Sequence, residues 1–225
     1  VLTIGAGLYF LLIRGAEISR LWWGISLVLW GIGALLAGTS YQAFAYEIKC
    51  AGRQSCAWTS WWEVVYLMFQ QASMNALLFG VTYSCTEGSW QALLVGFALV
   101  STAVYVVVAF IGALVPIKSR LTFNLMVWVS TPALLICFFL NGWRYYNYGD
   151  PMDLALLGTW ILLLLTSAIY WIYDELDVTM KLWRRKKSWF SQNDVLHVCL
   201  ILWAIYITTV VANRVRDYTP LVLPG

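Results

Sequence analysis

Histidine and charged residues are scarce in this sequence, and their scarcity excludes several classes of protein. The 225 residues include one histidine, His197, and 11% of the residues are charged. Soluble domains carry about 25% charged residues, so the composition argues against a soluble protein. A bis-histidine haem site needs two histidines, and zinc sites generally need three or four protein ligands. We therefore expect no metal site and no cofactor that depends on clustered histidines.

Other absences narrow the chemistry further. All lysines fall in expected loops or at helix ends, whereas covalent retinal binding needs a lysine inside the last helix of a seven-helix protein. The chain has no serine in a nucleophile elbow and no glycine-rich phosphate loop. The net charge of +3 is small and gives no indication of nucleic-acid binding. A rhodopsin, a serine hydrolase and a nucleotide-binding protein are therefore not indicated.

Apolar and aromatic residues are abundant instead. The chain is 61% hydrophobic, its mean hydropathy is +0.74, and it contains 14 Trp and 13 Tyr residues. Trp and Tyr concentrate at the two surfaces of a membrane. The composition predicts an all-α, polytopic membrane protein that forms one domain over residues 1–225, a bundle of seven transmembrane helices. Membrane lipids are the expected partners, together with other membrane protein subunits.

Seven apolar segments can be drawn along the chain. They are Val1–Ile13, Leu21–Tyr46, Trp61–Tyr83, Trp90–Val115, Leu121–Trp143, Leu154–Tyr173 and Ser191–Arg214. About 20 residues are needed for a helix to cross a bilayer, so the first segment is short by several residues. Because Val1 lies inside an apolar run, we expect the first helix to be truncated at its N-terminus.

Two longer connections bear on the orientation. The loop after the second segment holds Cys50 and Cys56, and the loop after the sixth holds a run of basic residues. The loops after the second, fourth and sixth segments share one side of the membrane. Together they hold nine Lys and Arg residues: Lys49, Arg53, Lys118, Arg120, Lys181, Arg184, Arg185, Lys186 and Lys187. The other side holds five: Arg14, Arg20, Arg144, Arg214 and Arg216. The excess predicts a cytoplasmic N-terminus. A Cys50–Cys56 disulfide would instead place that loop on the oxidising side, so the two indications disagree.

The last segment contains His197 together with Asp194, and ionisable residues inside a membrane span are candidates for function. Polar residues collect in the same leaflet at the ends of other segments. These candidates for a ligand pocket are Tyr41, Tyr46, Glu63, Asn124, Tyr170, Asn193 and His197. One interpretation is that helix ends are polar because they meet lipid headgroups, with Glu63 and Asp194 favoured by the helix dipole. The other is an internal polar pocket in which His197 pairs with Glu63.

Three short motifs resemble those of the CREST superfamily, the seven-helix group of alkaline ceramidases and adiponectin-receptor-like proteins. They are G-T-S-Y-Q-A-F-A-Y at Gly38–Tyr46, W-W-E-V-V-Y-L-M at Trp61–Met68 and N-D-V-L-H at Asn193–His197. In that family the motifs of helices two and seven contribute the histidines that bind zinc for lipid amide hydrolysis, and the motif of helix three begins with an Asp. Here Ala45 and Asn193 stand at two of the histidine positions, Glu63 stands at the Asp position, and His197 remains. The resemblance implies a member that lacks the metal site.

These observations support three hypotheses about function. The first is an integral membrane protein without a metal-dependent catalytic site, which acts as a receptor-like protein, a scaffold or a subunit of a membrane complex through lipid or protein contacts. The second is a CREST-like lipid hydrolase that uses His197 with Glu63 or Asp194. The third is a transporter or proton path through Glu63, Gln70 and His197. The first is favoured because the ligand set for a metal is incomplete.

Overall fold

The computed structural model describes residues 1–115 and 118–219, and all regular elements in this part of the chain are helical. Six of them are long and apolar enough to cross a membrane, namely Ile18–Ala43, Trp61–Cys85, Gly88–Leu114, Phe123–Tyr148, Pro151–Glu175 and Gln192–Val211. The predicted all-helical architecture is therefore confirmed. The lengths and compositions of the six long helices are compatible with a multi-pass membrane protein. The first expected segment forms α1 (Leu2–Ile13), which has 12 residues. Seven crossings stay a prediction.

The described chain divides into two compact units, which break within α6 (Phe123–Tyr148). The first unit comprises residues 1–137 and the tail from Val215, and the second comprises residues 138–214. The first unit contains α1, α2 (Ile18–Gly38), the π-helix η1 (Thr39–Ala43), α3 (Ala45–Lys49), α4 (Trp61–Cys85), α5 (Gly88–Leu114) and the 3-10 turn η2 (Lys118–Arg120). The second contains α7 (Pro151–Glu175), α8 (Val178–Lys186), α9 (Gln192–Tyr206) and the π-helix η3 (Ile207–Val211).

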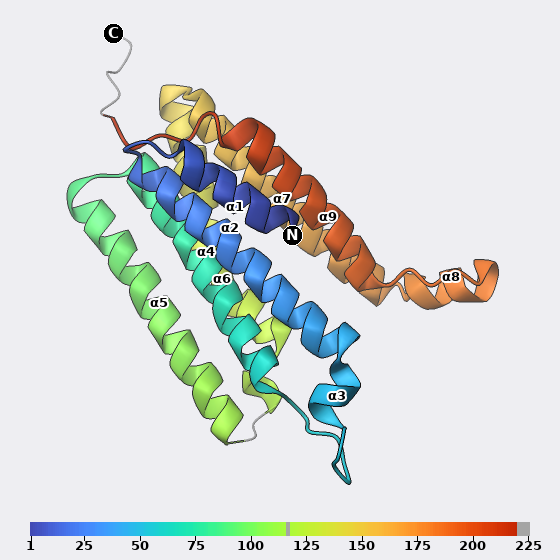
Figure 1. Cartoon of the computed structure of the whole chain (residues 1–225). Helices are drawn as coiled ribbons and strands as arrows, with labels where there is room; N and C mark the ends of the chain where they lie inside the picture. The colour runs from blue at the N-terminus through green and yellow to red at the C-terminus, as the bar shows by residue number, and fades with distance from the viewer. Residues whose placement is uncertain (116–117, 220–225) are drawn as a thin grey trace. The chain divides into compact units, whose positions relative to one another are not determined.

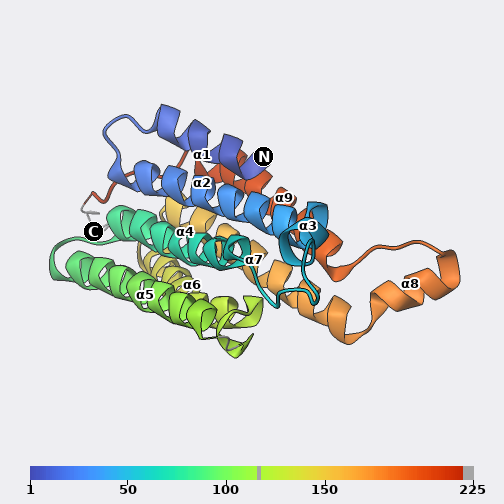
Figure 2. The same cartoon turned by 60° about the horizontal axis from the view of Figure 1, so that its bottom comes forward.

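Helix α4 is the central element of the first unit (Figure 1). It packs against α2 on one side and against α5 on another, while α1 covers α2 (Figure 2). Its most apolar 18-residue window is 78% buried, against 22% for α5. A cluster of buried residues, including Val64, Leu67 and Tyr105, joins α4 to α5. The outward residues of α5 are large and apolar, as expected for a helix that faces lipid.

Helices α1 and α2 approach closely at two glycines. A Cβ on Gly7 would lie 2.7 Å from the Gly24 carbonyl oxygen, and a Cβ on Gly24 would lie 2.7 Å from the Leu11 side chain. Small residues at such crossings allow backbones to pack without clashes. The close approach of α1 shows why position 24 is occupied by glycine.

The second apolar segment ends earlier than expected. Helix α2 widens into η1, and the chain breaks at Phe44, which has φ −130° and ψ 28°. Tyr46 and Glu47 consequently belong to the separate short helix α3, which corrects the predicted boundary at Tyr46. A π-helical turn inserts an extra residue into the helical repeat and often marks a functional site.

The C-terminal tail returns to the start of α2 within the first unit. The Asp217 carboxylate accepts hydrogen bonds from the backbone N–H groups of Ile18 at 2.9 Å and Ser19 at 2.7 Å. The Arg20 Nε donates to the Val215 carbonyl at 2.7 Å. The first N–H groups of a helix need acceptors, and the N-cap residue of α2 supplies none from its own side chain. Asp217 therefore caps α2 from the far end of the chain.

In the second unit, α7 packs against α9. A Cβ at Gly158 would overlap the phenol of Tyr206, whose hydroxyl donates to the Ala155 carbonyl at 3.0 Å. The Trp203 indole donates to the Thr159 carbonyl at 3.2 Å. The glycine thus admits a tyrosine between the two helices, and both aromatic donors are satisfied by carbonyls of α7.

Several boundaries differ from those expected. Helix α6 continues to Tyr148 rather than ending at Trp143, and α7 begins at Pro151 rather than Leu154. Gly149 at φ +65° and the N-cap Asp150, which accepts from the Met152 N–H at 2.9 Å, form the tight turn between them. The basic stretch expected to be a loop contains α8. Hydropathy locates apolar cores, but caps and turn residues set where helices end.

Candidate functional site

Glu63 lies in the first turn of α4 and is 4% exposed. Its backbone N–H donates to the Ser60 hydroxyl at 3.4 Å, so Ser60 caps the helix. The carboxylate forms an ion pair with Lys49 through Oε1 and accepts a hydrogen bond from the Thr59 hydroxyl at 3.0 Å through Oε2. Lys49 at the end of α3 therefore neutralises this buried carboxylate, and Thr59 of the following loop adds a hydrogen bond.

Tyr41 lies against the same ion pair, and Tyr66 lies against Tyr41. The Lys49 ammonium lies 5.1 Å from the ring centroid of Tyr41, and the rings of Tyr41 and Tyr66 meet edge-on at 6.0 Å. Tyr41 projects from the π-helix η1, which places its ring beside α3. We call Tyr41, Lys49, Thr59, Glu63 and Tyr66 the Glu63 cluster. An ammonium over an aromatic ring and beside a carboxylate is stabilised by both.

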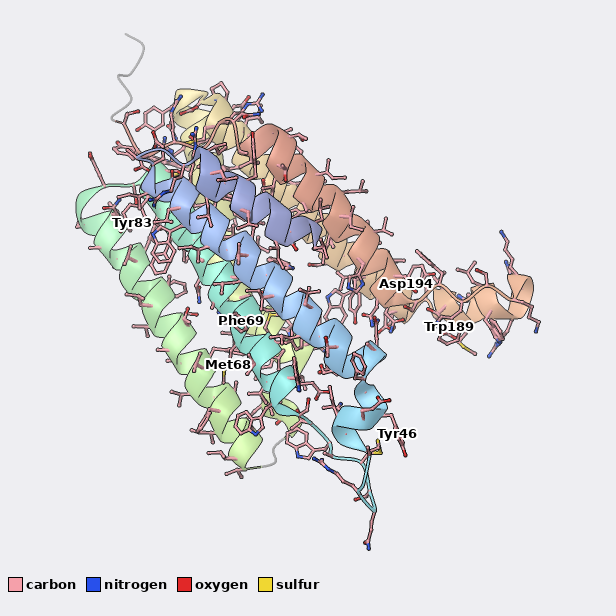
Figure 3. The ribbon with its side chains drawn as sticks, in the orientation of Figure 1. Tyr46, Met68, Phe69, Tyr83, Trp189 and Asp194 are labelled. Carbon is pink, nitrogen blue, oxygen red and sulfur yellow. A yellow bond between two sulfur atoms is a disulfide. The ribbon has the colours of Figure 1, made fainter. Side chains whose placement is uncertain are left out.

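The loop between α3 and α4 is closed by a disulfide between Cys50 and Cys56. The Ala57 N–H donates to the Lys49 carbonyl at 2.8 Å, which joins the two arms of the loop just outside the disulfide. Figure 3 shows Tyr46 beside this loop. The cross-link holds Lys49 at the start of the loop while the returning arm delivers Thr59, so both partners of Glu63 depend on this hairpin.

Further along α4, polar side chains bond to α2. The Gln70 amide donates to the Trp30 carbonyl at 3.2 Å. Ser26 and Ser73 each donate a hydroxyl to the other's backbone carbonyl at 2.8 Å. Interhelical hydrogen bonds of this kind hold membrane helices together. The polar side chains of Gln70, Ser26 and Ser73 therefore join α4 to α2.

Another face of α4 bonds to α5 and α6. The Gln71 amide oxygen accepts from the Ser130 hydroxyl at 2.7 Å, and its amide nitrogen donates to the Ser101 hydroxyl at 3.4 Å. The Asn75 amide donates to the Thr102 hydroxyl at 2.8 Å. Gln70, Gln71, Ser73 and Asn75 therefore all bond helices that neighbour α4.

Several buried polar atoms of α4 and α5 have no hydrogen-bond partner among the residues that the structure describes. They include the hydroxyls of Tyr105, Thr82 and Ser84 and the amide oxygen of Asn75. All four residues are at most 1% exposed. Burying a polar atom without a partner costs about 1–3 kcal/mol, so these positions call for bound water or another polar ligand.

The candidates in the last segment lie in the second unit. Asp194 forms a capping box with Ser191: its carboxylate accepts from the Ser191 N–H at 2.7 Å and hydroxyl at 2.8 Å. His197 is exposed, and its Nδ1 lies 2.6 Å from the Asn193 carbonyl oxygen one turn earlier. Tyr170 is half-buried with its ring edge-on to Trp171 at 6.0 Å. Glu63 belongs to the first unit, and its predicted pairing with His197 stays a prediction.

A buried ion pair in the second unit was missed by sequence reasoning. The Arg144 Nε donates to the Asp153 carboxylate at 3.1 and 3.3 Å, the Asn141 amide donates to it at 2.8 Å, and the Trp160 indole donates to the Asn141 amide oxygen at 2.8 Å. Arg144 is 4% exposed and Asp153 0%. The sequence signal for this ion pair was the dipeptide Gly149-Asp150, because a tight turn there makes α6 and α7 neighbours.

The remaining candidates are exposed, and no metal-binding group is found in the described part of the chain. Tyr46 is 68% exposed, and Asn124 is also exposed. Across residues 1–115 and 118–219, no three His, Cys, Asp or Glu side chains gather closely enough to bind a metal ion. The described clusters therefore offer paired charges and hydrogen-bonding groups rather than a ligand set for a metal.

Comparison with known proteins gives a family but no described activity. No curated protein matches the chain, and no solved structure matches it. One family model, described as a family of unknown function, matches residues 1–215. Because the match covers nearly the whole sequence, the chain belongs to this family, DUF6962.

Proposed function

We propose that this protein is a multi-pass integral membrane protein that acts through contacts with lipids or other membrane proteins, as a receptor-like protein, a scaffold or a subunit of a complex. The observation that carries the proposal is the state of Glu63, because both of its carboxylate oxygens are engaged, by Lys49 and by Thr59. A hydrolase would need this carboxylate as a base or a ligand. In the second unit His197 directs Nδ1 to its own helix.

The packing of the first unit supports membrane embedding. Helix α4 is buried and uses its polar side chains for interhelical bonds, whereas α5 presents apolar residues outward. This inverts the arrangement of a water-soluble bundle, whose outer faces are polar. We count α1 as a partial seventh crossing because it packs along α2 through Gly7 and Gly24.

The disulfide supports one of the two orientations. Four membrane crossings, α4 to α7, separate the Cys50–Cys56 loop from the basic loop of α8, so both loops lie on the same side if all four cross. Disulfides persist in oxidising compartments. We therefore propose that these loops face the oxidising side, against the indication of the Lys and Arg count. Mass mapping without reductant tests this, since two free thiols at Cys50 and Cys56 would restore the cytoplasmic assignment.

Lipid binding and hydrolysis are tested together on protein purified without chelator. We expect native mass spectrometry to show retained phospholipid, and we expect no turnover of ceramide or phospholipid and no stoichiometric zinc. His197→Ala should leave lipid retention unchanged. Hydrolysis that disappears in His197→Ala, together with one zinc per chain in the parent protein, would refute the contact function and establish the CREST-like hydrolase.

A transporter is the second candidate, and the buried atoms without partners favour it. The Tyr105, Asn75 and Thr82 atoms lie along α4 and α5, where water could connect them. Proteoliposomes with an internal pH dye provide the test. Proton flux that falls in Tyr105→Phe and persists in an outward-facing variant such as Phe97→Leu would support transport, whereas no flux above that of empty vesicles excludes a proton path.

A further inference from the structure

Helix α8 carries a basic surface that shares no residue with the Glu63 cluster. It connects α7 and α9 in the second unit and extends beyond their ends (Figure 1, Figure 2). Five basic residues lie within seven positions, Lys181, Arg184, Arg185, Lys186 and Lys187, and all are exposed. Because Lys181, Arg184 and Arg185 are spaced three and four apart, they share one helical face. We call these five residues the α8 basic surface.

The segment has a defined conformation. Asp177 at φ 47° begins the helix and Lys187 at φ 54° ends it, both in the left-handed region. The chain then returns toward α9, and the hydroxyl of Tyr173 in α7 donates to the carbonyl of Phe190, just before α9, at 2.8 Å. The rings of Trp183 and Trp189 meet edge-on at 6.2 Å. These contacts hold the basic surface and its aromatic neighbours in one arrangement.

The charges of this surface are not neutralised by the protein. None of the five basic residues forms an ion pair with a residue in the described ranges. The acids in the same connection, Asp174, Glu175 and Asp177, come before α8. Basic residues in a last helical turn are favoured by the helix dipole, which explains part of the clustering. The dipole does not explain Lys187, which lies past the helix, or the exposed aromatic residues.

Exposed aromatic residues accompany the charges. Trp183 is 41% exposed, and Trp189, labelled in Figure 3 near the start of α9, is 62% exposed. Tryptophan prefers the headgroup region of a bilayer, where its ring is in an apolar environment and its N–H can bond. Basic and aromatic residues together between two membrane-length helices match the surface of a bilayer that carries negative charge.

We propose that the α8 basic surface binds the headgroups of anionic phospholipids. This inference rests on the proposed contact function, for which it names the lipid class and the binding segment. Arginine matches phosphate with two parallel N–H donors, so Arg184 and Arg185 contact the phosphate while the neighbouring lysines add charge. Each basic residue near an anionic surface contributes enough to change affinity about fivefold.

The test is a titration of the full chain in detergent, followed by native mass spectrometry, with phosphatidylglycerol and with phosphatidylcholine of the same acyl chains. The variant Arg184→Gln/Arg185→Gln should lower phosphatidylglycerol affinity about 25-fold and leave phosphatidylcholine affinity unchanged. Arg184→Lys/Arg185→Lys should retain most of the preference, since charge is kept. Arg53→Gln, which removes an exposed basic residue of the disulfide loop, is the matched control and should have no effect.

Two results overturn the inference. One is equal affinity of the parent protein for the two lipids. The other is a phosphatidylglycerol affinity in Arg184→Gln/Arg185→Gln that lies within twofold of the parent. Both are distinguishable from failure of the proposed function, because a protein that retains neutral lipid without hydrolysing it would still act by contact. The substituted side chains are exposed, so the variants should stay folded, and thermal transitions equal to that of the parent protein verify this.

Discussion

The ion pair between Arg144 and Asp153 gives the sharpest test of the helical arrangement. Asp153 is 0% exposed and accepts from Arg144 and Asn141, so Asp153→Ala removes the carboxylate that both donors share. Removing one member of a buried ion pair costs about 3–5 kcal/mol, because the partner's charge stays buried without it. The loss of the Asn141 hydrogen bond adds little to this cost, because Asn141 and Arg144 donate to the same carboxylate.

Thermal unfolding in detergent measures this loss, with tryptophan fluorescence as the signal because Trp160 donates to Asn141. For a chain of this size about 1 kcal/mol shifts the transition by about 2–4 °C, so the expected decrease is about 6–20 °C. Glu175→Ala is the matched control, an acid at the exposed end of the same helix, and should shift the transition little. Replacing the pair together, by Arg144→Met/Asp153→Leu, should recover most of the loss.

A transition of Asp153→Ala within 1–2 °C of the parent protein, roughly the change expected for a surface substitution, would refute a stabilising ion pair. Additive effects of Arg144→Ala and Asp153→Ala in the double variant would refute it as well. Groups in direct contact show coupling of about 0.5–3 kcal/mol. Additivity would mean that the two side chains do not interact, and the α6–α7 hairpin would then be built differently.

Three further changes probe the first unit. Lys49→Met should destabilise it by about 1–3 kcal/mol, less than for a fully buried pair because the Lys49 side chain is 20% exposed, and adding Glu63→Gln should recover most of the loss in thermal unfolding. Gly24→Leu should lower stability by about 1–3 kcal/mol through overlap with α1, whereas Gly38→Leu, where a Cβ meets nothing within 4 Å, should be tolerated. Asp217→Ala should cost about 0.5–2 kcal/mol and accelerate hydrogen exchange in the first turn of α2.

The positions of the long helices could be predicted because hydropathy alone identifies a membrane-length apolar run. For α4 the predicted start at Trp61 is where the helix begins. Elements with another physical origin were missed. The break at Phe44 follows a π-helical turn, which has no hydropathy signal. Helix α8 has too many charges for an apolar run, and its basic residues were interpreted as a loop.

The pairing of Lys49 with Glu63 could not be predicted from the same information. Sequence reasoning proposed His197 because both residues lie in one leaflet, and it assigned Lys49 to the loop charges. The structure pairs Glu63 with Lys49 because the Cys50–Cys56 hairpin returns the chain to the start of α4. The two cysteines are six positions apart, so a local cross-link decides a contact that leaflet position leaves open.

The two glutamines of α4 show why burial in a membrane helix has to be argued side chain by side chain. Adjacent residues on a helix point about 100° apart, so Gln70 and Gln71 cannot face one neighbour. They bond α2 and α6 respectively. A central helix in lipid is surrounded by protein, and its polar residues can be distributed over several faces without meeting hydrocarbon. An amphipathic stripe is therefore absent from the helix on which the unit is built, and the polar residues that look most like a substrate path are the ones that hold the helices together.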